Sequence, residues 1–275
     1  MTAMETSLSD QQASQLTADL LEIYGYDFTA YSKASLKRRM SRLYLLDRFP
    51  SFAEFRYRLR SDVHYFSRFI KEVTVTVTEM FRDPLFFQTL KTEVLPVLAT
   101  YPFIRIWHAG CSTGEEVYSL AIFLKEANLL HKAILYATDI NAEAVKKAAT
   151  GIFPINQMKQ YSENYQQAGG AGEFSRYYTA SYNHVLFAEE LRKRMVFSTH
   201  NLVSETSFNQ FQLILCRNVL IYFENDLQGK VFTLFDESLD KLGYLALGSK
   251  ETLKLAPMIV SYRQVGREKI WRKVR

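Results

Sequence analysis

The stretch from Ile104 to Tyr118, which reads IRIWHAGCSTGEEVY, constrains the fold more than any other part of the chain. Its first residues predict a buried strand, and the small residues from Ala109 to Gly114 predict a tight turn into a helix. In an open α/β sheet, a turn of this kind at the carboxyl end of a strand is where a nucleotide-like ligand binds. We therefore expect a doubly wound sheet with a ligand site at this turn.

The charges in the turn indicate the kind of ligand. A dinucleotide site places a pyrophosphate on the helix N-terminus and needs glycines spaced G-x-G-x-x-G. Here Gly110 and Gly114 stand four apart, and Glu115 and Glu116 follow them. Because two carboxylates repel a phosphate at low dielectric, the turn predicts a ligand with ribose hydroxyls and a cationic head, such as S-adenosylmethionine. The alternative that one of the two acids only complements the helix dipole stays open.

The size and cysteine content limit the class of protein. A chain of 275 residues can bury one α/β core and a small second domain. It contains no apolar run of transmembrane length, and its N-terminus lacks the apolar region of a signal peptide. We therefore expect no membrane insertion and a cytoplasmic location. The two cysteines, Cys111 and Cys216, have no metal-ligand spacing, so we expect reduced thiols and no bound metal.

Residues 1–72 predict a separate basic helical domain. Apolar residues recur at helical spacing in four short segments, which predicts a small bundle. Eleven basic and three acidic residues between Tyr31 and Lys71 give a surplus of eight positive charges, against +5 for the whole chain. This surplus predicts an acidic partner. The candidate substrate-binding residues cluster on one predicted helix: Lys37, Arg38, Arg39 and Arg42. A merely solvated basic face is the alternative.

Residues 73–100 predict a linker and a connecting helix. The link from Val73 to Arg82 alternates β-branched residues with threonine and is expected to be extended. Asp83 and Pro84 are expected to cap a helix that Pro96 ends.

Residues 101–275 predict the ligand-binding domain. A strand over 133–138 ends in Asp139, where a ribose-binding carboxylate belongs; the alternative is an N-cap for a helix starting near Ala142. The alternation then breaks at 152–193, where short strands and a Gly169–Gly172 loop predict a β insertion, placed at about 155–193. The remaining expected elements are strands at 195–198, 211–216 and 243–248, a helix at 226–239 and a hairpin at 259–274.

Few side chains suggest acid–base chemistry. His108 and His200 have no nucleophile at a motif spacing and are interpreted as structural, as is Cys111 in its tight turn. An acceptor carboxylate, with a pKa near ~4.3, is already ionised and needs no general base. Arg82 would orient such a carboxylate, because a guanidinium binds it with two hydrogen bonds.

Two asparagines follow strand ends. Asn201 and Asn218 can point amide groups into one crevice, although Asn218 could also cap a helix. Tyr222 is a candidate for the site or for the core.

Five motifs in order resemble the CheR-type chemotaxis receptor methyltransferases. They are TVTEMFR ending at Arg82, AGCSTGEEVYS from Ala109, ATDI around Asp139, HNL at 200–202 and CRNVLIYF from Cys216. The resemblance implies a class I methyltransferase (Rossmann-like) α/β sheet, an N-terminal helical bundle and a small inserted antiparallel β-subdomain. It implies S-adenosylmethionine-dependent methyl esterification of glutamates on chemoreceptor cytoplasmic helices.

The resemblance also assigns site residues by motif position. Arg82 and Tyr222 become the candidate catalytic residues. The candidate cofactor-binding residues are Thr76, Thr78, Arg82, Gly110, Glu115, Glu116, Asp139, Asn201, Leu202, Asn218 and Val219. Thr76 stands where the family usually has asparagine.

The partners follow from the same resemblance. The basic domain would meet the acidic receptor helices, and some relatives bind a receptor C-terminal peptide on the β-subdomain. We expect a monomer that does not bind nucleic acid. A nucleic-acid methyltransferase and a cofactor-binding scaffold without activity are the two rival interpretations.

Overall fold

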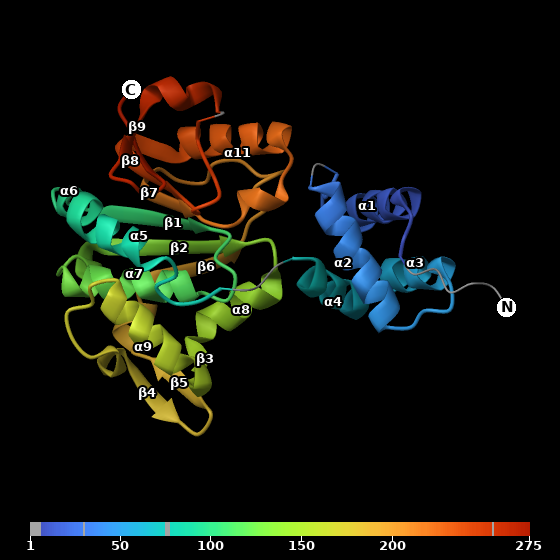
Figure 1. Cartoon of the computed structure of the whole chain (residues 1–275), viewed down its shortest axis with the longest axis horizontal. Helices are drawn as coiled ribbons and strands as arrows, with labels where there is room; N and C mark the ends of the chain where they lie inside the picture. Colours follow the sequence, from blue (N-terminus) through green and yellow to red (C-terminus); the bar gives the residue numbers. More distant parts are fainter. Residues whose placement is uncertain (1–6, 30, 75–77, 255) are drawn as a thin grey trace. The chain divides into compact units, whose positions relative to one another are not determined.

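The computed structural model describes residues 7–29, 31–74, 78–254 and 256–275 (Figure 1). The chain forms two compact units: Met1–Val75 with Ile221–Lys230, and Thr76–Leu220 with Val231–Arg275. None of the helices in the described part of the chain has the length and apolar character of a membrane span.

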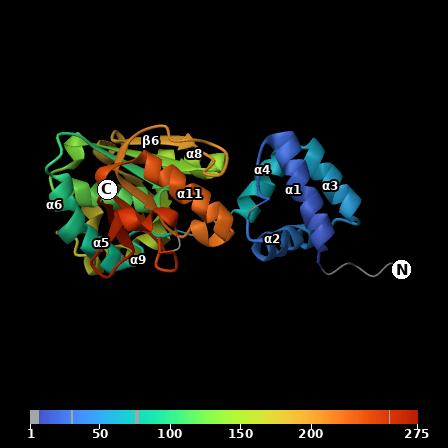
Figure 2. The same ribbon diagram turned by 90° about the horizontal axis from the view of Figure 1, so that it is seen from above.

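The first unit contains the predicted four-helix bundle (Figure 2). Its helices are α1 (Asp10–Tyr24), α2 (Lys33–Leu46), α3 (Phe52–Ser61) and α4 (Val63–Val73). Ser9 caps α1 with a reciprocal capping box, and Ser51 and Asp62 cap α3 and α4 through their side-chain oxygens. Apolar side chains from all four helices form one core. Within it the Asp19 carboxylate is buried and accepts hydrogen bonds from Arg56 and Arg60.

The second unit contains a seven-stranded sheet in the order β6-β2-β1-β7-β8-β10-β9. The strands are β1 (Ile104–Ala109), β2 (Ala133–Asp139), β6 (Met195–Thr199), β7 (Phe211–Cys216), β8 (Leu239–Leu247), β9 (Tyr262–Val265) and β10 (Ile270–Lys273). The first five are parallel, and β10 is antiparallel to both β8 and β9, so the predicted terminal hairpin is confirmed.

The strand order reverses between β1 and β7. From β1 the chain moves outward to β2 and β6, with α7 (Glu115–Glu126) and α8 (Ala142–Thr150) in the crossovers. It then returns to β7 and reaches β8 through α11 (Asn225–Ser238). Right-handed crossovers in opposite directions cover both faces of the sheet. The sheet is therefore doubly wound, and the ligand crevice is expected at the carboxyl ends of β1 and β7.

The insertion differs in part from its prediction. The small antiparallel sheet has the order β3-β5-β4, from β3 (Ile152–Pro154), β4 (Tyr178–Ser181) and β5 (His184–Phe187), and lies below the large sheet in Figure 1. The alternation between Phe174 and Tyr178 predicts one of these short strands, but residues 174–177 form a 3-10 turn in which Phe174 and Tyr177 are buried. Helix α9 (Met158–Gln167) was not predicted, although its buried residues recur at helical spacing. The short helix α10 (Glu189–Arg192) precedes β6.

The connecting helix also departs from its prediction. It starts as α5 (Pro84–Thr89), with proline in the first turn as expected, and passes through a π-helical turn, η1 (Leu90–Val94). Pro96 does not end it, because α6 (Leu95–Leu98) follows with that proline in its first turn, where no intrahelical N–H bond is needed. Asp83 precedes α5 but makes no side-chain capping bond.

Candidate active site

The turn after β1 depends on two glycines with positive φ. Gly110 has φ 86° and Gly114 has φ 95°, which only glycine adopts easily. A Cβ on Gly110 would overlap the Cγ2 methyl of Val219, and one on Gly114 would lie 2.9 Å from Ala148 Cβ. The amides of Gly110 and Cys111 donate to the carbonyl of Thr138, at 2.8 and 2.9 Å. The turn is thus pressed against the end of β2 on one side and the loop after β7 on the other.

Asp139 ends β2 beside this turn. Its Oδ2 accepts the backbone N–H of Ser112 at 2.8 Å, and its Oδ1 accepts that of Asn141 at 2.9 Å. Burial raises the pKa of the Asp139 carboxyl, an effect that the hydrogen bonds from these backbone amides partly offset. Asn141, not Asp139, caps α8 through its side chain. The N-cap alternative for Asp139 is therefore wrong, and its carboxylate retains lone pairs for a ligand hydroxyl.

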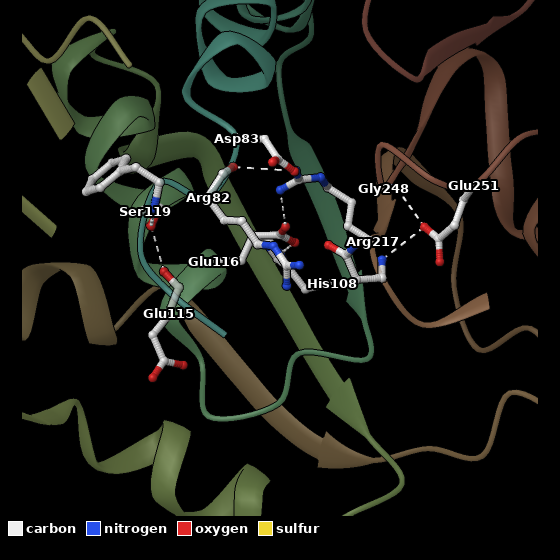
Figure 3. A network of polar contacts seen from close by, with 11 residues as sticks. Arg82, Asp83, His108, Glu115, Glu116, Ser119, Arg217, Gly248 and Glu251 are labelled. Carbon is white, nitrogen blue, oxygen red and sulfur yellow. Dashed lines mark hydrogen bonds and ion pairs between the residues drawn. The ribbon is translucent and has the colours of Figure 1, made fainter. Parts of the chain in front are cut away.

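The two glutamates that open α7 have different surroundings. Glu115 is 4% exposed and accepts the Thr113 hydroxyl at 2.6 Å; burial raises the pKa of its carboxyl. Glu116 accepts His108 Nδ1 at 3.1 Å and Arg217 Nη1 at 2.9 Å (Figure 3). Burial opposes the ionisation of Glu116, but these two partners outweigh it and hold the pKa of its carboxyl below the ordinary value.

This pairing modifies the charge pattern expected at the turn. Arg217 and His108 engage the Glu116 carboxylate directly, whereas no arginine or lysine forms an ion pair with Asp139 or Glu115 within the described residues. His108 is 1% exposed and is one of the polar groups that fix Glu116, which agrees with the structural interpretation of this histidine. Contact of Glu116 with the cofactor stays a prediction.

The Arg82 segment packs against the start of α7. Phe81 N–H donates to the hydroxyl of Ser119 at 3.0 Å, and the carbonyl of Met80 accepts Asn164 Nδ2 at 3.0 Å. The ring of Phe81 is buried in the core. Arg82 itself is half-buried, and its guanidinium has no hydrogen bond or ion pair to the described residues. It can therefore bind a carboxylate of a substrate or a cofactor.

Two asparagine-containing loops complete the site predictions. Asn201 follows β6, and its Oδ1 accepts the N–H of Val203 at 3.0 Å, so its oxygen serves a local turn. Asn218 follows β7 with φ 61°, and its N–H donates to Glu251 Oε2 at 2.9 Å. Leu202 and Val219 are half-buried. That these residues bind the cofactor stays a prediction, and the same holds for the other candidate site residues.

The remaining predicted residues are distributed as follows. Thr76 lies outside the described residues, and Thr78 is half-buried before the Arg82 segment. Tyr222 belongs to the first unit, where the guanidinium of Arg39 lies 5.4 Å from the centre of its ring. Its carbonyl accepts the N–H of Ser32 at 2.8 Å.

The basic residues of α2 flank a surface groove of the bundle. Lys37 and Arg38 line it together with Arg42 and the exposed side chains of Leu45 and Leu46. Lys37 forms an ion pair with Asp10 at 2.8 Å, whereas Arg38 and Arg42 are exposed and have no ion-pair partner among the described residues. The bundle thus presents unpaired guanidinium groups next to apolar surface, which suits an acidic amphipathic helix.

Both cysteines are buried free thiols. Burial raises the pKa of Cys111 and of Cys216 well above the ordinary value, so neither is a thiolate at neutral pH. This disfavours Cys111 as a nucleophile and agrees with a structural role in the tight turn.

Two residues of the site were missed by the sequence analysis. Arg217 is 9% exposed and bonds both Glu116 and Asp83, and Glu251 is 5% exposed and accepts the amides of Asn218 and Gly248. A signal was present for Arg217: it directly follows a strand that is apolar except for Gln212, and a charge that is buried beside such a strand needs a partner. For Glu251 the sequence offers no comparable signal.

The donor set fits S-adenosylmethionine. The glycine turn leaves no room for a side chain, an acid with free lone pairs ends β2, and the Arg82 guanidinium is unpaired within the described residues. Asp139, with Glu116 or Glu115, would hold the ribose and other polar groups of the cofactor, and the site needs no phosphate on the ligand. Together with the strand order, this site defines a class I methyltransferase.

Comparison with known proteins identifies the family within this class of methyltransferases. Residues 76–266 match the family described as "CheR methyltransferase, SAM binding domain", and residues 11–74 match "CheR methyltransferase, all-alpha domain". The chain belongs to the CheR methyltransferase family, and its cofactor is S-adenosylmethionine.

Curated relatives extend over most of the chain. Cher3 of Pseudomonas putida is 46% identical over 232 residues, which is 84% of each chain. A chemotaxis protein methyltransferase of Listeria innocua is 30% identical over 231 residues, 83% of this chain and 85% of its own. Another of Borreliella burgdorferi is 28% identical and covers 91% of each chain.

Proposed function

We propose that the protein forms methyl esters on glutamate side chains of chemoreceptor cytoplasmic helices, by direct in-line transfer without a general base. The relatives named as chemotaxis protein methyltransferases support the choice of acceptor. The observation that carries the mechanism is the Arg82 guanidinium, which is half-buried and has no partner among the described residues.

The acceptor's chemistry explains why the site needs no base. A glutamate carboxylate is ionised at neutral pH and is itself the nucleophile. When bound, S-adenosylmethionine supplies an electrophilic methyl group on a sulfonium. Arg82 holds the acceptor carboxylate in line, and exclusion of water from the reacting groups raises the rate. Positioning and desolvation then supply most of the rate.

The acidic receptor helix would bind to the bundle. Arg38 and Arg42 provide unpaired positive charge, and Leu45 and Leu46 provide apolar surface in the same groove. We also propose a monomeric enzyme in the cytoplasm, in keeping with its two reduced thiols. Docking of a receptor C-terminal peptide on the small β-sheet is a separate prediction, which titration with such a peptide tests.

The test combines transfer with cofactor binding. Radiolabelled methyl transfer to a glutamate-containing receptor fragment is measured for the wild type and for Arg82→Ala, and cofactor affinity is measured by calorimetry. We expect base-labile methyl esters with the wild type only, and cofactor affinity within a fewfold in the variant. Transfer by Arg82→Ala at the wild-type rate would refute the assigned role.

A further inference from the structure

The backbone around Arg82 is strained on both sides. Phe81 has φ 54° and Asp83 has φ 57°, so two residues with a Cβ adopt the left-handed region immediately before and after the arginine. Such conformations persist only where the surrounding structure fixes them, and they are common at functional sites. Some contacts must therefore hold this turn in place.

The side of the turn before Arg82 is held by two hydrogen bonds. Ser119 on α7 accepts Phe81 N–H, and Asn164 on α9 donates to the Met80 carbonyl. Neither contact reaches the residues after Arg82, so a different group must fix that side.

The side after Arg82 is held by Arg217. Its Nη2 donates to Asp83 Oδ2 at 2.6 Å and approaches the Arg82 carbonyl at 3.4 Å, while its Nη1 donates to Glu116 Oε2 at 2.9 Å (Figure 3). Its guanidinium carbon lies 3.9 Å from the centre of the Phe86 ring. A single planar group thus joins the end of β7, the first turn of α7 and Asp83, the residue directly before α5.

We propose that Arg217 is a positioning residue that holds the Arg82 turn in its strained conformation and so aims the Arg82 guanidinium at the acceptor. This inference rests on the proposed function, in which Arg82 binds the acceptor carboxylate. The terminal nitrogens of Arg217 are already engaged, Nη1 by Glu116 and Nη2 by Asp83, and its guanidinium lies against the Phe86 ring, while its Nε is buried without a hydrogen-bond partner. Arg217 therefore acts through Arg82 rather than on the acceptor itself.

The fork geometry of arginine is required for this role. Glu116 and Asp83 are both acids, and without the shared cation they would repel each other and open the turn. A lysine keeps the charge, but its point-like ammonium cannot satisfy both carboxylates and also stack on an aromatic ring. Arg217→Lys therefore tests geometry at constant charge.

A second variant tests the same contact from the other side. Asp83→Asn removes the charge while keeping the shape, and asparagine tolerates the left-handed region as well as aspartate does. Asp236→Asn is the matched control, because Asp236 is also a partly exposed aspartate in an ion pair, with Lys273 at 3.2 Å, and is outside the proposed site.

The experiment measures kcat and KM for the receptor fragment, cofactor affinity by calorimetry, thermal unfolding, and hydrogen exchange in the 78–86 peptide. We expect Arg217→Lys to lower kcat about 10- to 100-fold, in line with the cost of a misplaced catalytic group. Asp83→Asn should lower kcat less, and the double variant should be little worse than Arg217→Lys. Cofactor affinity should fall less than kcat, because the role assigned to Arg217 acts on the acceptor-binding arginine. Exchange should rise in 78–86 but not in the control.

The outcomes separate this inference from the proposed function. A wild type that forms no methyl ester would refute the proposed function, while hydrogen exchange in Arg217→Lys would still test the positioning role. Unchanged kcat and unchanged exchange in Arg217→Lys would overturn the inference. So would equal losses of kcat, cofactor affinity and thermal stability, because these would indicate a merely structural residue.

Discussion

Substitution of Gly110 by alanine tests whether the turn after β1 requires glycine because of its positive φ and its close contact with Val219. Two costs add. Placing a Cβ at φ 86° costs about 1–2 kcal/mol. Overlap with Val219, whose Cγ1 and Cβ also lie only 3.4 and 3.5 Å from the added carbon, costs about 1–3 kcal/mol. We expect Gly110→Ala to lower the free energy of unfolding by about 2–5 kcal/mol, the sum of these two terms.

The two costs can be separated. Val219→Ala removes both γ-methyl groups, so the double variant should recover the overlap cost but not the backbone cost. Gly229→Ala is the control, because its added Cβ meets nothing within 4 Å and its place in α11 favours alanine. Urea unfolding gives the stabilities, and calorimetry should show cofactor affinity reduced at least about tenfold in Gly110→Ala. A Gly110→Ala protein as stable as the wild type, or a double variant without recovery, would refute the reasoning.

Three further predictions concern charge. Asp139→Ala should lower cofactor affinity more than it lowers kcat at saturating cofactor. Calorimetry measures the first quantity and saturation kinetics the second. Glu116→Gln should lower stability at pH 7 by about 1–3 kcal/mol. Because the pKa of Glu116 is held below its usual 4.5, this stabilisation is present above that pH and is lost on acidification, so acid unfolding curves of variant and wild type should converge below about 4.5. Arg38→Glu with Arg42→Glu should raise KM for the receptor fragment at least about tenfold at low salt and less at high salt, without changing cofactor affinity; a salt-independent KM would contradict the proposed docking face.

Local patterns predicted most of the fold. The hydrophobic periodicity and the small residues between Ile104 and Tyr118 predict the strand, the glycine turn and the helix after it. These elements depend on residues only a few positions apart in the sequence. The misses have local causes as well. Helix α9 carries Met158, Tyr161 and Tyr165 at helical spacing, but the surrounding tyrosines and glycines favoured strands. Pro96 was interpreted as a helix end, although a preceding π turn lets the helix continue.

The site could be predicted only as a set of segments. Sequence position placed Asp139 at a strand end beside the turn, and the structure confirms that place because parallel strands end at one edge of the sheet. It did not distinguish Glu115 from Glu116. That difference arises because Arg217, 101 positions later, bonds the second acid and leaves the first beside Thr113.

The chain by itself therefore determined the alternation of strands and helices, the glycine turn, the basic bundle and the identity of the residues gathered near the cofactor turn. Tertiary structure alone decided which of those residues are paired and which are free. Arg82 and Arg217 look equivalent in the sequence, yet Arg217 is paired with two acids and lies against an aromatic ring, while the Arg82 guanidinium has no partner among the described residues. The physical reason is that hydrophobic periodicity acts within a helix or strand, whereas the pairing of a buried charge depends on which distant elements the sheet brings together.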